Sequence, residues 1–303
     1  MRPTERVEKG DPSGIQQKFT TPPVKIWCCR FWKLKEWCCT NMAFPYWRIY
    51  RNKNEGGILE YKGKQYRMKP DTLYIIPPNT LYHGYMDQKQ KGFNGIHVKG
   101  SRVEADEDEK EIARDHLLHL FIHFNLGVPF DYITPGIYTL SPDAGQLKKI
   151  EWLIEKIKTD PAIFPVQASM FIQSLILEAL GQLEEISWEH SSTDTRILKV
   201  IRYIDQKTTH TPPNHELATM INLADNSFVR LFKKEMGMPV QRFIKEQKIN
   251  KACAMLDHTD LTIDEVAART GFADRYHFTR IFRQIKNIPP GRYRRQRMQS
   301  NLG

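Results

Sequence analysis

The last hundred or so residues contain an internal repeat, and no other feature of the sequence limits the possible fold as strongly. One copy begins at Glu216 with ELATMINLADNSFVRLFKKEMGMPVQRF, and the other begins at Glu265 with EVAARTGFADRYHFTRIFRQIKNIPPGRY. Four positions match at an offset of 49 residues. After one inserted residue, Arg230, Phe232, Pro239 and Phe243 correspond to Arg280, Phe282, Pro289 and Tyr293 at an offset of 50. Duplication of one supersecondary unit explains this pattern, so we expect two similar helical units.

Each copy has the pattern of a short helix, a tight turn and a longer helix. In the second copy we expect the short helix over Asp264–Thr270. It should end at Gly271, because glycine readily adopts the left-handed conformation at a helix C-terminus. Asp274 is expected to cap the longer helix, Arg275–Ile285, and Asp225 to cap its counterpart in the first copy.

Both longer helices are amphipathic, with phenylalanine and aliphatic residues on one face. The opposite, polar faces carry Asn226, Arg230, Lys233 and Lys234 in the first copy and Arg275, Tyr276, Thr279, Arg280 and Arg283 in the second. Such side chains near a helix N-terminus suit the major groove of DNA, where they read base edges. Between the copies we expect a long helix, Pro239 to Leu256, whose basic face includes Arg242, Lys245 and Lys248.

The positive charge of the chain is concentrated in the same region. The formal net charge is +10, and residues 193–303 account for +9 of it. A basic domain attached to a nearly neutral body is typical of a protein that binds a polyanion. A solvated basic surface alone would have the same composition, so the charge supports DNA binding only together with the repeat.

The repeat resembles the DNA-binding domain of the AraC/XylS family of transcription regulators. The resemblance rests on FVRLFKKEMGMPVQRF in the first copy and on GFADRYHFTRIFRQIKNIPPGRYR in the second, and it covers about Thr195–Arg297. Asn222 stands where the family usually has glycine, and Ala224 and Ala273 stand where it often has serine. The resemblance implies a sequence-specific regulator that binds double-stranded promoter or operator DNA, with RNA polymerase as a further possible partner.

The first half of the chain has the pattern of short antiparallel strands. Ile58–Tyr61 and Gln65–Met68 flank a Lys62-Gly63-Lys64 turn, and Thr72–Ile76 follows as a third strand. In Leu118–Leu126, apolar residues alternate with others, which indicates a strand with one buried face. We therefore expect an antiparallel barrel or jelly roll.

Helical periodicity replaces this pattern after Ser141, with one helix around Gln146–Ile157 and another around Met170–Leu183. The whole chain is thus an α+β protein with an all-α C-terminal domain. We expect a flexible arm (1–24), a ligand-sensing and dimerisation domain (25–188), a linker (189–195) and a DNA-binding domain (196–298). Its helix-turn-helix units lie at about 214–236 and 263–286. A homodimer should form through one of the two helices.

The strand-rich half resembles the cupin-like sensor domain of sugar-responsive members of the family, through its Lys69-Pro70-Asp71 turn, YIIPPNTLYH and LHLFIHF. The resemblance implies a small-molecule effector, a carbohydrate in the first instance. Aromatic faces stack on sugar C–H groups, and Arg and His bind hydroxyls. The implied ligand residues are Arg51, Tyr82, His83, His119 and Phe121.

Two other functions stay open: a cupin-type metalloenzyme and a DNA-binding protein without an effector. The sequence has no H-x-H pattern of the kind found in cupin metal sites, which argues against the metalloenzyme. His116, His119 and His123 lie close in sequence, but alternation places His116 off the face shared by the other two. Two vicinal cysteine pairs could bind a metal or form a thiol switch, but they also suit ordinary packing: Cys28, Cys29, Cys38 and Cys39. We expect no catalytic residue, metal or cofactor. No apolar run is long enough for a membrane helix, so a cytoplasmic protein is expected.

Overall fold

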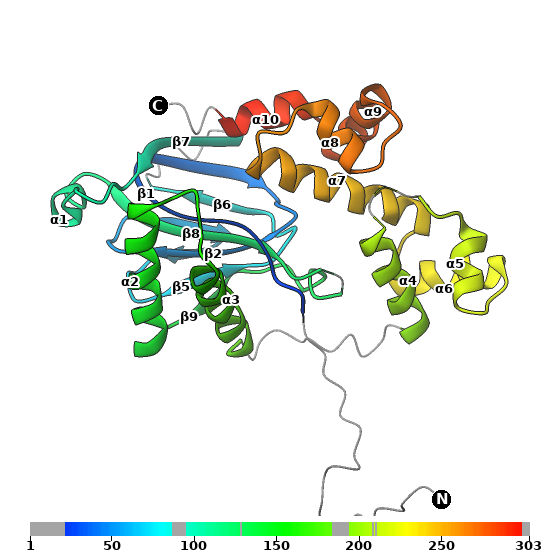
Figure 1. Ribbon diagram of the computed structural model, residues 1–303, viewed down its shortest axis with the longest axis horizontal. Helices are drawn as coiled ribbons and strands as arrows, with labels where there is room; N and C mark the ends of the chain where they lie inside the picture. Colours follow the sequence, from blue (N-terminus) through cyan, green and yellow to red (C-terminus); the bar gives the residue numbers. More distant parts are fainter. Residues whose placement is uncertain are drawn as a thin grey trace, which may run out of the picture.

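The structure, a computed structural model, describes residues 22–86, 95–127, 129–183, 194–207, 209 and 211–298. An antiparallel sheet with helices against it forms the N-terminal part, and a group of helices forms the C-terminal part (Figure 1). The expected α+β fold class is confirmed. The expected arm and linker lie mostly outside the described residues. None of the described helices has the length and apolar character that crossing a membrane requires.

The sheet is formed by strands whose order is β4-β3-β6-β1-β8-β2-β5-β9, with β7 also paired to β1. The strands are β1 (Lys25–Met42), β2 (Trp47–Asn52), β3 (Ile58–Tyr61), β4 (Lys64–Arg67), β5 (Leu73–Ile76), β6 (Tyr82–Tyr85), β7 (Gly95–Arg102), β8 (Leu117–Asn125) and β9 (Tyr138–Leu140). The expected hairpin is confirmed as β3 and β4, around a turn in which Lys62 and Gly63 have positive φ angles of 48° and 80°.

The two faces of the sheet bury different side chains. One face packs aliphatic residues against α2 (Ala144–Thr159) and α3 (Val166–Gly181), while the short α1 (Glu109–Ile112) precedes β8. The other face is rich in aromatic residues and packs against Ala254 of the C-terminal part. Successive side chains of β8 point to opposite faces of the sheet. Leu120 and Ile122 belong to the aliphatic core, whereas Phe121 packs against the aromatic core.

The C-terminal part contains the two expected units, α5–α6 and α8–α9, and α7 connects them (Figure 1). Each unit has its own hydrophobic core, and α7 contributes residues to both. The helices are α4 (Thr195–Gln206), α5 (Asn214–Met220), α6 (Asp225–Met236), α7 (Val240–His258), α8 (Ile263–Arg269), α9 (Arg275–Lys286) and α10 (Pro290–Met298).

The turns inside the two units follow the expected conformations, with one exception at a cap. Asn222 and Gly271 have φ angles of 54° and 70°, in the left-handed region. Asp274 caps α9 by accepting a hydrogen bond from the backbone N–H of His277 at 2.7 Å. The prediction for Asp225 was wrong: Ala224 is the N-cap, and Asp225 is the first residue inside α6, where its carboxylate favours the positive end of the helix dipole.

Lys248 also differs from the expectation, because it does not belong to an exposed basic face of α7. Its side chain is 6% exposed, and its ammonium group donates to Thr211 Oγ1 at 2.7 Å and to the carbonyl of Gly271 at 2.9 Å. These bonds hold α7 against the turn of the second unit, while Arg242 and Lys245 remain exposed.

We predict that Gly271→Ala destabilises the protein far more than Gly237→Ala. Both glycines have a φ of +70°, so the left-handed conformation destabilises either alanine variant by about 1 kcal/mol. A Cβ at residue 271 would lie 2.2 Å from the carbonyl oxygen of Thr209, whereas a Cβ at residue 237 has no heavy atom within 4 Å. Urea unfolding should show an additional loss of about 2 kcal/mol for Gly271→Ala. Equal losses would contradict this close approach.

Candidate DNA interface and ligand pocket

The residues expected to contact DNA lie on the solvent side of α6 and α9. All are exposed except Thr279, which is half-buried: Asn226, Arg230, Lys233, Lys234, Arg275, Tyr276, Arg280 and Arg283. The opposite faces of the two helices are buried through Phe228 and Phe232 in α6 and through Phe278 and Phe282 in α9. The packing of these aromatic rings therefore determines which side chains each helix presents to solvent.

On α9 the polar side chains form a shallow groove along the helix. Its lining consists of Arg275, Tyr276, Thr279, Arg280, Arg283 and Gln284. Tyr276 is 87% exposed, which is unusual for a large aromatic side chain. Gln284 was missed from the sequence, although it follows Arg280 by one helical turn and so shares its face. Arg275 also forms an exposed ion pair with Asp264 at 3.2 Å.

The aromatic face of the sheet encloses a second candidate site, a cavity of about 140 Å³. Three of the five expected ligand residues line it: Tyr82, His119 and Phe121. Sequence reasoning missed its other aromatic walls, which come mainly from β1 and β2: Trp32, Trp37, Phe44, Tyr46 and Tyr50. Alternation of side chains along β1 was the sequence signal that could have identified these residues. It was difficult to recognise within the long WCCRFWKLKEWCC segment.

Arg51 and His83 lie outside the cavity lining. Arg51 donates to Glu151 Oε1 of α2 at 3.0 Å and to the carbonyl of Pro70 at 3.2 Å. Alternation along β2 places Tyr50 toward the cavity and Arg51 toward α2. His83 follows Tyr82 on β6, so the same alternation turns its side chain away.

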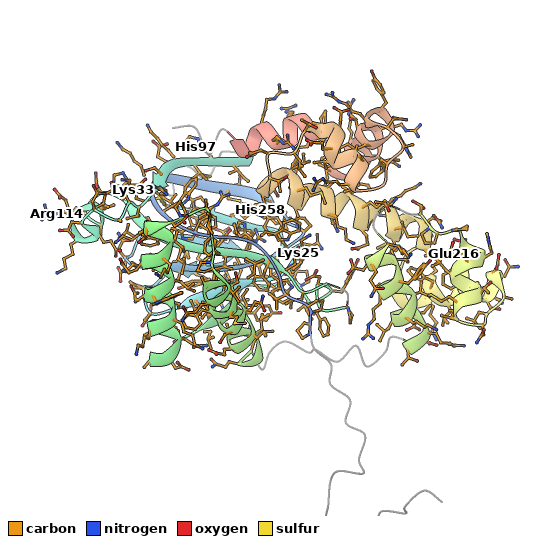
Figure 2. All side chains as sticks on the ribbon, viewed as in Figure 1. Lys25, Lys33, His97, Arg114, Glu216 and His258 are labelled. Carbon is orange, nitrogen blue, oxygen red and sulfur yellow. The ribbon has the colours of Figure 1, made fainter. Side chains whose placement is uncertain are left out.

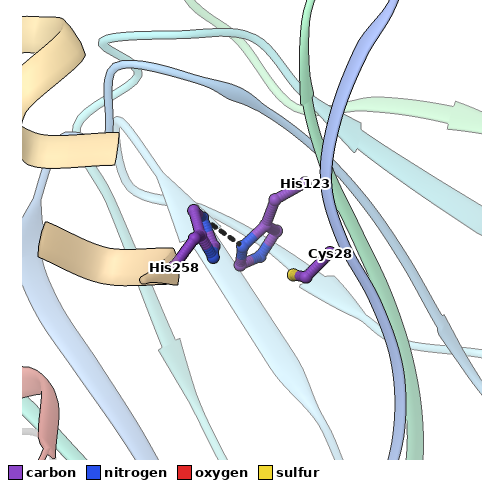
Figure 3. A group of neighbouring side chains, drawn as sticks. All are labelled: Cys28, His123 and His258. Atoms are coloured by element: carbon purple, nitrogen blue, oxygen red, sulfur yellow. Dashed lines mark hydrogen bonds between the residues drawn. The ribbon is translucent and has the colours of Figure 1, made fainter. Parts of the chain in front are cut away.

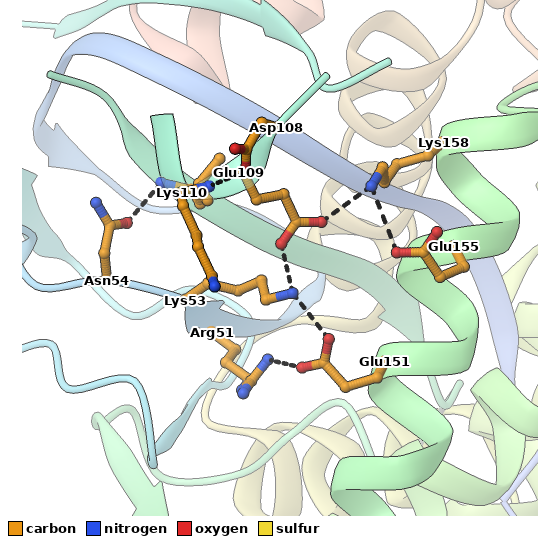
Figure 4. Close-up of polar contacts among 10 residues, drawn as sticks. Arg51, Lys53, Asn54, Asp108, Glu109, Lys110, Glu151, Glu155 and Lys158 are labelled. Carbon is orange, nitrogen blue, oxygen red and sulfur yellow. Dashed lines mark hydrogen bonds and ion pairs between the residues drawn. The ribbon is translucent and has the colours of Figure 1, made fainter. Parts of the chain in front are cut away.

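Arg51 belongs instead to a network of charges between the sheet and the helices (Figure 4). Glu151 accepts hydrogen bonds from both Arg51 and Lys53, and Lys53 also pairs with Glu109. Glu109 in turn pairs with Lys158 at 3.1 Å. The network ties α1 and α2 to β2, which is a structural role.

His119 is a deeply buried histidine of the cavity lining. Its imidazole is 4% exposed, and Nδ1 lies 2.7 Å from Asn52 Oδ1, which as an acceptor fixes the proton on Nδ1. Burial lowers the pKa of His119 to about 3, so the ring is neutral at pH 7. Trp37 and Tyr50 pack against it, with ring centroids at 5.3 and 4.9 Å.

Arg48 lies beneath the same aromatic cluster and was also missed. It is fully buried, and within the described residues its three guanidinium nitrogens have no hydrogen-bond partner. The guanidinium carbon lies 4.1 Å from the ring centre of Phe44 and 4.5 Å from that of Tyr82. These π faces partly offset the cost of burying the cation. The result is a positive charge directly behind two cavity walls.

The end of α7 forms one side of the cavity, so the C-terminal part contributes to it directly. Asp257 and His258 are lining residues. Tyr46 from the sheet and Tyr293 from α10 each donate to Asp257 Oδ2 at 3.1 Å. His258 lies where α7 meets the sheet (Figure 2). A molecule in this cavity would therefore contact both parts of the chain.

Comparisons with known proteins identify the C-terminal part. Residues 217–296 match the family model described as a helix-turn-helix domain. The regulatory protein PocR of Salmonella typhimurium is 30% identical over 103 residues, 34% of each protein. The transcriptional activator RhaS of Klebsiella pneumoniae is 26% identical over 127 residues, which cover 42% of this chain and 45% of RhaS. The chain thus matches less than half the length of these two relatives.

Some relatives are similar to this chain over a longer stretch. The arabinose operon regulatory protein of Escherichia coli is 20% identical over 253 residues, 78% of this chain and 76% of that protein. Among solved structures, ToxT from Vibrio cholerae covers 90% of this chain with a TM-score of 0.49 and 10% identity. The C-terminal domain of this chain is a helix-turn-helix domain. The expected resemblance is confirmed for this domain.

Proposed function

We propose that the protein is a sequence-specific transcription regulator that binds double-stranded DNA through α6 and α9. The observation that carries this proposal is the equivalent placement of Arg230 and Arg280, both exposed on the second helix of a helix-turn-helix unit. In this proposal residues 25–188 sense an effector, residues 196–298 bind DNA in the cytoplasm, and no catalytic activity is involved. RNA polymerase is a possible further partner.

The length of α7 supports simultaneous binding of both units. Its 19 residues span about 28 Å at about 1.5 Å per residue. One turn of B-DNA is about 34 Å long, so α6 and α9 can enter successive major grooves on one side of the duplex. Because their exposed side chains differ, each helix should read its own base cluster, and the site need not be palindromic.

Footprinting of the intact chain on a site selected from random DNA tests this proposal. We expect two protected base clusters about ten base pairs apart for each bound protomer. Arg230→Ala should remove protection from one cluster and Arg280→Ala from the other, each weakening binding by about 1–3 kcal/mol. Lys62→Ala is the matched control, because it removes one exposed charge from the β3–β4 turn.

Two results would contradict the arrangement. A single protected cluster of four or five base pairs would mean that only one helix reads DNA. Equal losses of affinity by both arginine variants on selected and random DNA would mean that the arginines contact phosphates without reading bases.

We propose further that the cavity binds a small-molecule effector of the carbohydrate class. A relative that matches 78% of this chain is named for the arabinose operon. The aromatic walls suit the C–H faces of a sugar, and the hydroxyl groups of Tyr50 and Tyr82, 3.1 Å apart, suit its hydroxyls.

A thermal-shift screen of neutral sugars, sugar acids and non-carbohydrates should find a carbohydrate that raises Tm with a saturable dose dependence. Tyr50→Phe keeps the ring but removes one hydroxyl, so it should weaken binding about five- to tenfold, the loss of one hydrogen bond. His83→Ala, whose side chain is directed away from the cavity, should bind normally. Stabilisation by non-carbohydrates alone would overturn the proposed ligand class.

The homodimer is also a proposal, and the structure favours α3 over α2 as its interface. The apolar side chains of α2 are buried in the sheet core, including Ile150, Leu153, Ile154 and Ile157. At α3, apolar side chains remain exposed: Ile163 (71%), Val166 (71%), Met170 (62%) and Leu177 (43%). An exposed apolar stripe of this kind is typical of a protein interface.

We expect the intact chain to sediment as a dimer and Met170→Asp to sediment as a monomer at the same concentration, because a buried unpaired carboxylate is costly. Lys148→Glu changes an exposed residue of α2 and should remain dimeric. A wild-type monomer at high concentration would disprove the dimer, and a dimeric Met170→Asp would place its interface elsewhere.

A further inference from the structure

Three potential metal ligands meet where the sheet contacts the C-terminal part (Figure 3). Cys28 comes from β1, His123 from β8, and His258 is the last residue of α7. One ligand atom from each residue lies within 4.8 Å of the other two. Cys28 and His258 are half-buried and His123 also lines the cavity, so the cluster is largely shielded from solvent.

The topology of the sheet explains why Cys28 takes part. Cys28 is opposite His123 in the β1–β8 pairing, and the register shifts between Ile26 and Cys28. Such an irregularity redirects side chains along a strand. The neighbouring Cys29 belongs to the aliphatic core on the other face of the sheet. Of this vicinal pair, only Cys28 thus faces the two histidines.

The spacing of the two imidazoles fits a tetrahedral ion. His123 Nδ1 and His258 Nε2 are 3.3 Å apart and share a hydrogen bond, which a bound ion would replace. Two nitrogens bound to zinc at about 2.0–2.1 Å in tetrahedral geometry are about 3.3 Å apart. One thiolate and two imidazoles form a ligand set suited to Zn²⁺ and to other late first-row divalent ions. The fourth position would be open to water or to a molecule in the cavity, which His123 and His258 also line.

We propose that Cys28, His123 and His258 form a binding site for a zinc-class divalent cation that fastens α7 to the sheet. Binding replaces the thiol proton of Cys28, which leaves to solvent, and both imidazoles bind in the neutral form. The internal repeat gave no indication of this metal site, because two of the three ligands, Cys28 and His123, come from the sheet.

The ion would fix the orientation of the DNA-binding domain relative to the sheet. Helix α7 contributes to the cores of both helix-turn-helix units, so anchoring its last residue restrains both. This regulatory consequence rests on the proposed function, but the presence of the metal site does not.

The test is titration of the chelator-treated, full-length protein with Co²⁺, whose spectrum reports its ligands. We expect one equivalent to bind, with visible d–d bands of tetrahedral coordination and a near-ultraviolet thiolate-to-cobalt band, and Zn²⁺ to displace it. Cys28→Ser should abolish the thiolate band, and His258→Gln should weaken binding about tenfold or more, since even outer partners of metal ligands contribute 10–100-fold. Cys29→Ala, one residue away on the other face, should leave the spectrum unchanged.

A wild-type protein without cobalt bands overturns the proposal, and so does a thiolate band that survives Cys28→Ser or disappears in Cys29→Ala. Zn²⁺ should also raise the Tm of the wild type and of Cys29→Ala by more than that of His258→Gln, and this comparison remains informative if one variant folds poorly. Because neither measurement involves DNA, failure of the metal site and failure of the proposed regulator are distinguished.

Discussion

The continuity of α7 is the constraint on which the rest of the C-terminal structure depends. Its first half packs into the core of the first unit through Val240, Phe243 and Ile244. Its second half packs into the core of the second unit through Ile249 and Leu256, and Ala254 reaches the aromatic core of the sheet. Because one uninterrupted helix contributes to three cores, α6, α9 and the cavity share a single rigid connector.

In the N-terminal part, the alternation of side chains along the strands constrains which residues reach the cavity. On β2, neighbouring residues serve opposite functions: Tyr50 lines the cavity, whereas Arg51 holds α2. On β8, His119 and Phe121 line the cavity, whereas Leu120 packs under the helices. A shift of one residue in register would exchange these roles, so the buried aliphatic face determines what the cavity contains.

Much of the C-terminal domain could be predicted because its signals are local. The turn at Gly271 and the cap at Asp274 depend on neighbouring residues, and each is found as expected. Lys248 could not be predicted, because its burial depends on Thr211, which is distant in sequence. The cavity was only partly predictable for the same reason: its last wall, Asp257 and His258, comes from the end of a helix assigned to the other domain. Arg51 was expected among the ligand residues because the resemblance identifies the strand but not the face on which each of its residues lies.

One oxygen atom, Asp257 Oδ2, joins three elements of the chain. It accepts one hydrogen bond from Tyr46 of the sheet region and one from Tyr293 of α10. If α7 moves away from the sheet, it carries Asp257 and α10 with it, and the bond to Tyr46 must break in full. Hydrogen bonds are short-ranged and weaken steeply with distance and angle, so partial separation retains little of this bond. Separation of α7 from the sheet would therefore lose the hydrogen bond from Tyr46, whereas the bond from Tyr293 could move with α7.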